Sequence, residues 1–122
     1  GMEIVAKKLN QRWIGSDVVA HYIPEYYNPG WEETERFTKE VLGVSETSND
    51  GHHDDIWVTA MMMVTDPEQV RYRQRIDAGL ASINGVEITP IDATIELGRK
   101  MLEFRAEFTA DAIRKATQSS KQ

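Results

Sequence analysis

The chain contains no cysteine, so disulfide bonds and zinc sites built from thiolates are excluded. No apolar run approaches the roughly 20 residues that a helix needs to cross a bilayer, and no succession of basic, apolar and small residues indicates a signal peptide. A phosphate-binding glycine loop, a dinucleotide fingerprint and a nucleophile motif are missing as well. These absences predict a cytoplasmic protein, without contact to a membrane, that works by binding rather than by catalysis.

Acidic residues outnumber basic ones by 20 to 14 in a chain of 122 residues, which gives a formal charge of −6. Such a surface repels nucleic acid, so a nucleic-acid partner is not expected. The length predicts one globular domain, which we expect over residues 2–117. Gly1 is interpreted as the remnant of an expression tag, and residues 118–122 as a frayed tail.

Helices are expected in the N-terminal part of the chain. Apolar residues recur every four positions in residues 2–14, and Ser16 or Asp17 is suited to cap a short second helix that Pro24 would end. A third helix is expected after Asn28-Pro29-Gly30, with Gly43 as its C-terminal cap.

A long helix is expected at the C-terminal end, from Pro90 to about Thr117, because a threonine cap and a first-turn proline precede it. Wound at about 100° per residue, it shows two apolar stripes. One stripe is Leu97, Met101, Phe104 and Phe108, and the other is Ile91, Ile95, Leu102 and Ile113. One face of a small domain covers only one of them. The second is therefore predicted to meet the N-terminal helices or a second subunit.

The central segment, residues 56–89, supports two interpretations. As an antiparallel β-meander, it pairs 56–64 with 70–76 around the turn Thr65–Glu68, and 80–83 with 86–89 around Asn84-Gly85. That register sorts Trp57, Met61, Met63, Val70, Tyr72 and Ile76 onto one face. In the alternative, Asp66 and Pro67 start a helix and the chain is all-α. The meander sorts apolar from charged residues more cleanly, so an α+β fold is predicted.

A metal site is suggested by one segment only, His52-His53-Asp54-Asp55, because imidazole and carboxylate groups are ligands of zinc, manganese and iron(II). Neighbouring residues of a strand point to opposite sides, so a site here needs further ligands from elsewhere, such as His21 or the helix that carries Glu32, Glu33 and Glu35. One alternative function is therefore a metal-dependent hydrolase that binds a divalent metal at this segment.

Arg71, Arg73 and Arg75 alternate along the second predicted strand, about 7 Å apart on one face. This row suggests nucleic-acid binding along a phosphate backbone as another alternative.

Tyr26, Tyr27 and Trp31 lie in a segment rich in proline and glycine, where aromatic side chains either anchor a loop or form a binding platform. The leading expectation is an interaction or assembly module that binds itself or another protein.

Overall fold

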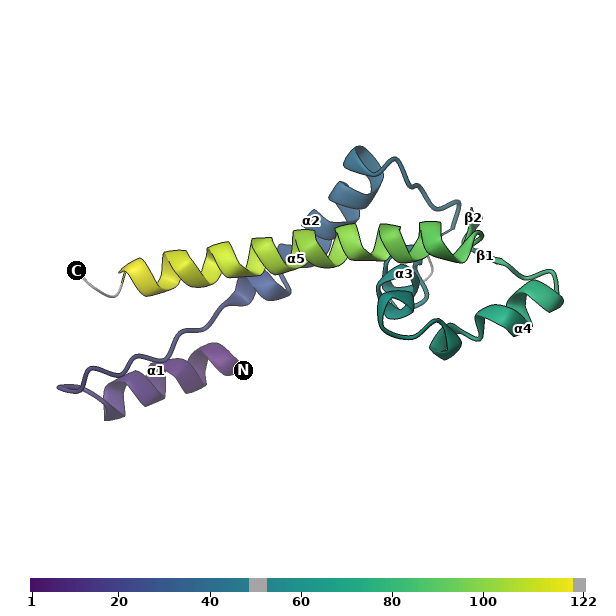
Figure 1. Ribbon diagram of the computed structural model, residues 1–122. Helices are drawn as coiled ribbons and strands as arrows, with labels where there is room; N and C mark the ends of the chain where they lie inside the picture. The colour runs from purple at the N-terminus through teal and green to yellow at the C-terminus, as the bar shows by residue number, and fades with distance from the viewer. Residues whose placement is uncertain (49–52, 120–122) are drawn as a thin grey trace.

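The computed structural model describes residues 1–48 and 53–119 and is mostly helical (Figure 1). Its α-helices are α1 (Met2–Arg12), α2 (Gly30–Arg36), α3 (Ile56–Thr65), α4 (Tyr72–Asp77) and α5 (Ile91–Ser119). Two 3₁₀ turns at Pro24–Tyr26 and Pro67–Val70, a π-helical turn at Phe37–Val41, and two short strands, β1 (Ser82–Ile83) and β2 (Val86–Glu87), complete it. The long C-terminal helix predicted from the sequence is confirmed.

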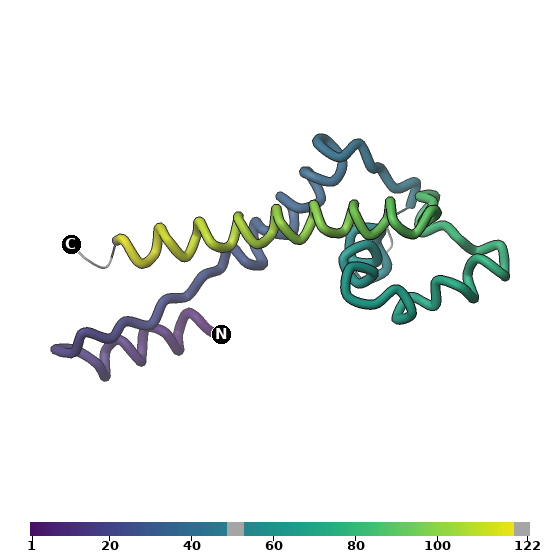
Figure 2. The backbone as a smooth tube through the Cα atoms, viewed as in Figure 1, coloured from purple at the N-terminus to yellow at the C-terminus, as the bar shows by residue number. Residues whose placement is uncertain are grey.

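Helix α5 is the axis of the molecule, and α3 packs against its first half (Figure 2). The two helices approach closely at Gly98, where an added Cβ would lie 2.1 Å from the carbonyl oxygen of Ala60. A mid-helix glycine normally costs about 1 kcal/mol relative to alanine. Here it permits backbone contact between two helices, as only glycine can.

The buried core consists of two clusters along α3. In the first, Ile56 packs with Ile83 and Ile88, and this contact holds the segment of β1 and β2 against the start of α3. In the second, Trp57 and Ala60 pack with Met101 of α5. The predicted stripe that contains Met101 is thus the one that faces the domain, and its Phe104 stacks on Phe37 at a ring distance of 4.3 Å.

The predicted meander is wrong over residues 56–77, where the structure has α3, a 3₁₀ turn and α4. Residues 56–64 are apolar at nearly every position, so their burial period could not be read from the sequence. Asp66 and Pro67 start a helical turn, as the alternative interpretation predicts. The carboxylate of Asp66 caps it by accepting a hydrogen bond of 3.0 Å from the amide of Glu68. The predicted apolar face of Trp57, Met61, Met63, Val70, Tyr72 and Ile76 does not form, because these residues lie on helices and turns.

The structure is mostly helical, as the alternative predicts for residues 56–77, but residues 82–87 form a short β-hairpin. Ile83 pairs with Val86 as predicted, and Asn84 and Gly85 adopt the positive φ values of 48° and 84° that such a turn requires. Glu46 fixes the hairpin in place, since its carboxylate accepts hydrogen bonds from Asn84 Nδ2 (2.9 Å) and the amide of Ile56 (2.8 Å).

Helix α1 forms as expected, but the predicted second helix before Pro24 does not. The side chain of Asn10 bonds both the amide (2.7 Å) and the carbonyl (2.9 Å) of Ala20, and holds that segment extended. The third helix forms as α2 and continues through the π-helical turn to Gly43, whose φ of 71° suits a C-terminal cap.

Within the described parts of the chain, no helix combines the length and the apolar character needed to span a membrane.

Replacing Gly98 with alanine is expected to lower the free energy of unfolding by about 3 kcal/mol or more, because the new methyl group would overlap the Ala60 carbonyl. Helix propensity alone predicts a change of the opposite sign. Urea denaturation followed by circular dichroism distinguishes the two. A variant as stable as the wild type would contradict the close approach.

Candidate functional site

A cavity of about 590 Å³ lies between the start of α3, the second 3₁₀ turn, α4 and β1. It brings together segments that are distant in the sequence. Its walls are lined by His53, Asp54, Thr59, Gln69, Val70, Arg71, Gln74, Arg75, Ala78, Leu80 and Ile83. Residues from both chemically suggestive segments of the sequence, the histidine–aspartate cluster and the arginine series, therefore share one cavity.

The arginine row does not form as predicted, because residues 72–77 are helical rather than extended. Arg71 and Arg75 line the cavity, and Arg75 Nη1 donates to the carbonyl of Leu80 at 3.3 Å. Arg73 is not part of the cavity lining and forms an exposed ion pair with Glu68 at 3.1 Å. The nucleic-acid hypothesis thus loses the regular ladder on which it was based.

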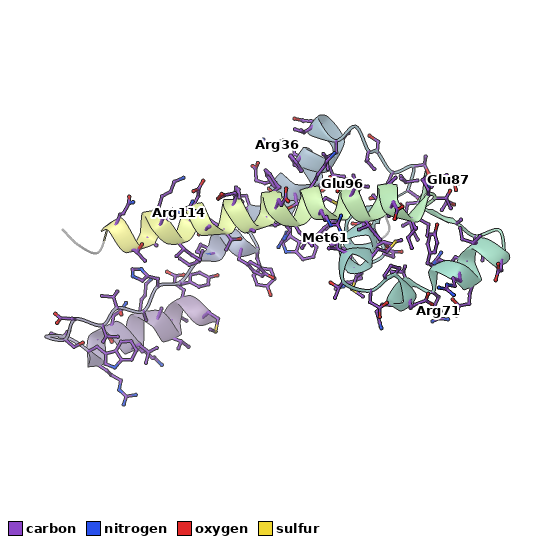
Figure 3. The ribbon with its side chains drawn as sticks, viewed as in Figure 1. Arg36, Met61, Arg71, Glu87, Glu96 and Arg114 are labelled. Carbon is purple, nitrogen blue, oxygen red and sulfur yellow. The ribbon has the colours of Figure 1, made fainter. Side chains whose placement is uncertain are left out.

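Arg71 has an unusual backbone conformation, with φ 51° and ψ 44°. A non-glycine residue seldom adopts this left-handed region, where it is strained by about 1 kcal/mol or more. The residue joins the 3₁₀ turn to α4 at the place labelled in Figure 3. Residues held in this way are found frequently at ligand-binding sites.

The histidine–aspartate cluster is divided by the fold. His53 and Asp54 line the cavity, whereas Asp55 is only 1% exposed and accepts a hydrogen bond from Trp57 Nε1 at 3.2 Å. His52 lies outside the described residues. No group of three potential metal ligands occurs in residues 1–48 and 53–119, and the metal site stays a hypothesis from the sequence.

The predicted aromatic site is also divided. Trp31 packs edge-on against Trp57 at a ring distance of 4.6 Å. The guanidinium of Arg105 lies 5.3 to 5.7 Å from the ring centres of Tyr26, Trp31 and Trp57. It also donates hydrogen bonds of 3.2 Å to Thr34 Oγ1 and to the carbonyl of Tyr26. Trp31 therefore helps to bind an arginine of its own chain, which is a structural role.

Tyr26 and Tyr27 remain exposed and line a second, apolar depression of about 330 Å³. We call this depression the arm groove; its lining is Met2, Val5, Ala6, Leu9, Ala20, His21, Tyr22, Ile23, Tyr26 and Tyr27. The arm groove lies between α1 and residues 20–27. The apolar stripe of residues 2–14 was readable in the sequence, but its exposure was not.

Helix α1 has no buried residue, and it makes no extensive contact with another helix or strand of the described chain. Met2 is 70% exposed and Val5 48%. Figure 1 shows α1 and the extended segment after it projecting from the rest of the molecule, on the side of the C-terminal half of α5. We call residues 1–23 the N-terminal arm. An apolar surface of this kind is typical of an interaction site.

No protein-family model, curated protein or solved structure gives a significant match to this chain.

Replacing Arg105 with alanine is expected to lower the free energy of unfolding by about 3 kcal/mol, because two charge-assisted hydrogen bonds and the contacts with three rings are lost. The control is Arg99→Ala on the same helix, whose exposed ion pair with Glu96 should contribute less than about 0.5 kcal/mol. Chemical denaturation of both variants measures the difference. Equal losses would show that neither the hydrogen bonds nor the aromatic contacts of Arg105 stabilise the fold.

Proposed function

We propose that this protein is a self-assembly module in which the N-terminal arm of one copy docks on α5 of a second copy. The observation that carries the proposal is the exposure of α1, an amphipathic helix without a buried residue. Burial of apolar surface contributes about 25 cal/mol per Å². A folded helix that leaves its apolar side chains in water is therefore stabilised by a surface that covers them.

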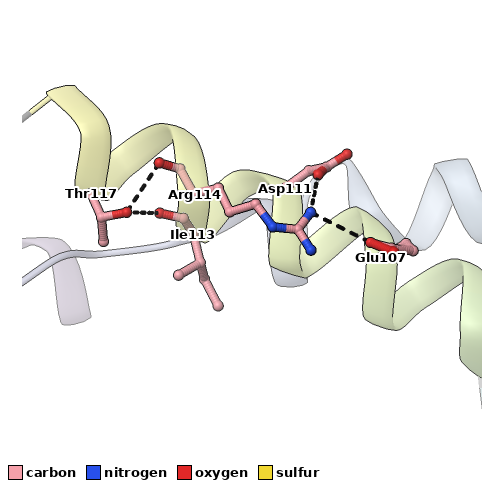
Figure 4. A network of polar contacts seen from close by, with 5 residues as sticks. All are labelled: Glu107, Asp111, Ile113, Arg114 and Thr117. Atoms are coloured by element: carbon pink, nitrogen blue, oxygen red, sulfur yellow. Dashed lines mark hydrogen bonds and ion pairs between the residues drawn. The ribbon is translucent and has the colours of Figure 1, made fainter.

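The receiving surface is the second stripe of α5. Leu102 is 39% exposed and Ile113 46%, and both project from the same side of the helix. Figure 4 shows the Ile113 side chain directed away from the ion pairs that Arg114 forms with Glu107 and Asp111. The apolar side of α5 is thus separate from its charged network.

The lengths of the two surfaces agree. The apolar side of α1 and its C-cap extends from Met2 to Trp13. The exposed part of the stripe on α5 extends from Leu102 to Ile113. Both pairs are eleven residues apart, which corresponds to about 16 Å along a helix axis. Two helices can therefore lie side by side over the full extent of both surfaces.

Charge favours the same pairing. Residues 1–23 contain three basic and two acidic side chains, whereas residues 24–122 contain eleven basic and eighteen acidic ones. A hydrogen bond from Lys7 lowers the pKa of Glu3, so these two charges satisfy each other. Lys8 and Arg12 are left beside the apolar side of the arm, and the rest of the chain carries the acidic excess. Opposite charges across the interface increase specificity and the rate of association.

The wild-type chain is expected to be a dimer or larger at micromolar concentration in multi-angle light scattering. Val5→Glu on the arm and Ile113→Glu on α5 should each shift it towards the monomer, because both place a charge in the apolar contact. The matched control is Val41→Glu, an equally drastic change at a side chain that is 68% exposed elsewhere on the surface.

Mixing the two variants provides the sharper test. A mixed dimer contains one intact contact, between the arm of Ile113→Glu and the stripe of Val5→Glu, so partial recovery of the dimer is expected. Arm-to-arm pairing predicts instead that Ile113→Glu stays dimeric without mixing. A wild-type chain that is cleanly monomeric, or a dimer that survives both substitutions, would refute the proposal.

A further inference from the structure

We propose that the cavity between α3, α4 and β1 binds a small organic anion, a phosphate or carboxylate carried on an apolar body. This site is separate from the self-assembly surface. Figure 1 shows α4 near the N-terminal end of α5 and the arm near its C-terminal end. The proposal therefore does not depend on the oligomeric state.

The charge of the cavity is opposite to that of the protein. The whole chain carries −6, but the cavity lining contains Arg71 and Arg75 against a single carboxylate, Asp54, and His53 adds a further nitrogen donor. Two guanidinium groups can donate several hydrogen bonds to one oxyanion. Asp54 reduces the positive charge without cancelling it.

Arg71 is available for a ligand. Its side chain has no ion pair or hydrogen bond within residues 1–48 and 53–119, and it is exposed at the cavity wall. Arg73, two residues further, is instead held by Glu68. The strained backbone of Arg71 thus directs the one arginine of the series that has no partner in the described chain to the cavity.

The rest of the lining fits the apolar part of such a ligand. Val70, Ala78, Leu80 and Ile83 supply hydrocarbon surface, and the Thr59 hydroxyl and the amides of Gln69 and Gln74 supply polar groups. A volume of about 590 Å³ lies in the range of small-molecule sites. A nucleic-acid strand is disfavoured, because it needs a continuous row of phosphate contacts and Arg73 lies outside the cavity.

The test is calorimetric titration of the purified full chain with phenyl phosphate and, in a second arm, with benzoate. Saturable binding of at least one of them is expected, with a Kd of about 1 mM or lower. Arg71→Gln should weaken it at least tenfold, about 1.4 kcal/mol. Arg73→Gln should leave it unchanged. A preference for phenyl phosphate identifies the ligand class as organic phosphates, and a preference for benzoate identifies it as carboxylates.

Three further probes can overturn the proposal. If phenol binds as tightly as the two organic anions, the charge of the ligand does not contribute to binding. If inorganic phosphate binds as tightly, the apolar wall of the cavity does not contribute. Single-stranded DNA that binds in a salt-dependent manner, weakened equally by Arg71→Gln and Arg73→Gln, would identify a nucleic-acid surface instead. The absence of saturable binding by both organic anions refutes the site, provided that circular dichroism shows the chain to be folded.

Discussion

The fold depends on the contact between the backbone of α5 at Gly98 and the carbonyl of Ala60 on α3. With the two helices this close, Trp57 packs with Met101 in one cluster of buried residues, and Ile56 packs with Ile83 and Ile88 of the hairpin segment in another. Helix α2 and the turn at Pro24–Tyr26 also pack on α5, whereas α1 stays outside this packing. The position of the cavity is set in the same way, since α3 supplies one wall and the hairpin fastened to it supplies another.

Several polar side chains of this small protein form hydrogen bonds between different segments of the chain. Arg105 joins α5 to the turn at Tyr26 and to Thr34 of α2. Glu46 joins the loop before α3 to the start of α3 and to the hairpin turn. Asn10 joins α1 to Ala20. Such bonds specify geometry more than they add stability, because each replaces hydrogen bonds to water. They explain how a chain with a modest apolar core holds irregular segments in defined positions.

Local signals in the sequence were sufficient for the parts of the fold that carry them. The long C-terminal helix, the turn at Asn84-Gly85 and the cap at Gly43 each follow from a few neighbouring residues. Residues 56–64 carry no such signal, because a run that is apolar throughout reveals neither a helical nor a strand period. Interpreting that segment as a strand makes residues 70–76 its partner, and this pairing in turn places the arginines in a row. The cavity shared by His53 and Arg71 is a product of tertiary packing, and no spacing along the chain indicates it.

The short length of α1 has a thermodynamic consequence. A helix of eleven residues lies below the roughly 12–15 residues at which isolated helices become stable in water, and here the double hydrogen bond from Asn10 supplies part of the missing support. Its helix–coil equilibrium is therefore linked to whatever covers its apolar side, so that docking and helix formation become one coupled reaction. Any partner of the arm would bind with an unfavourable ordering entropy that depends on temperature, and the strength of association would change with the helical propensity of residues that never touch the interface.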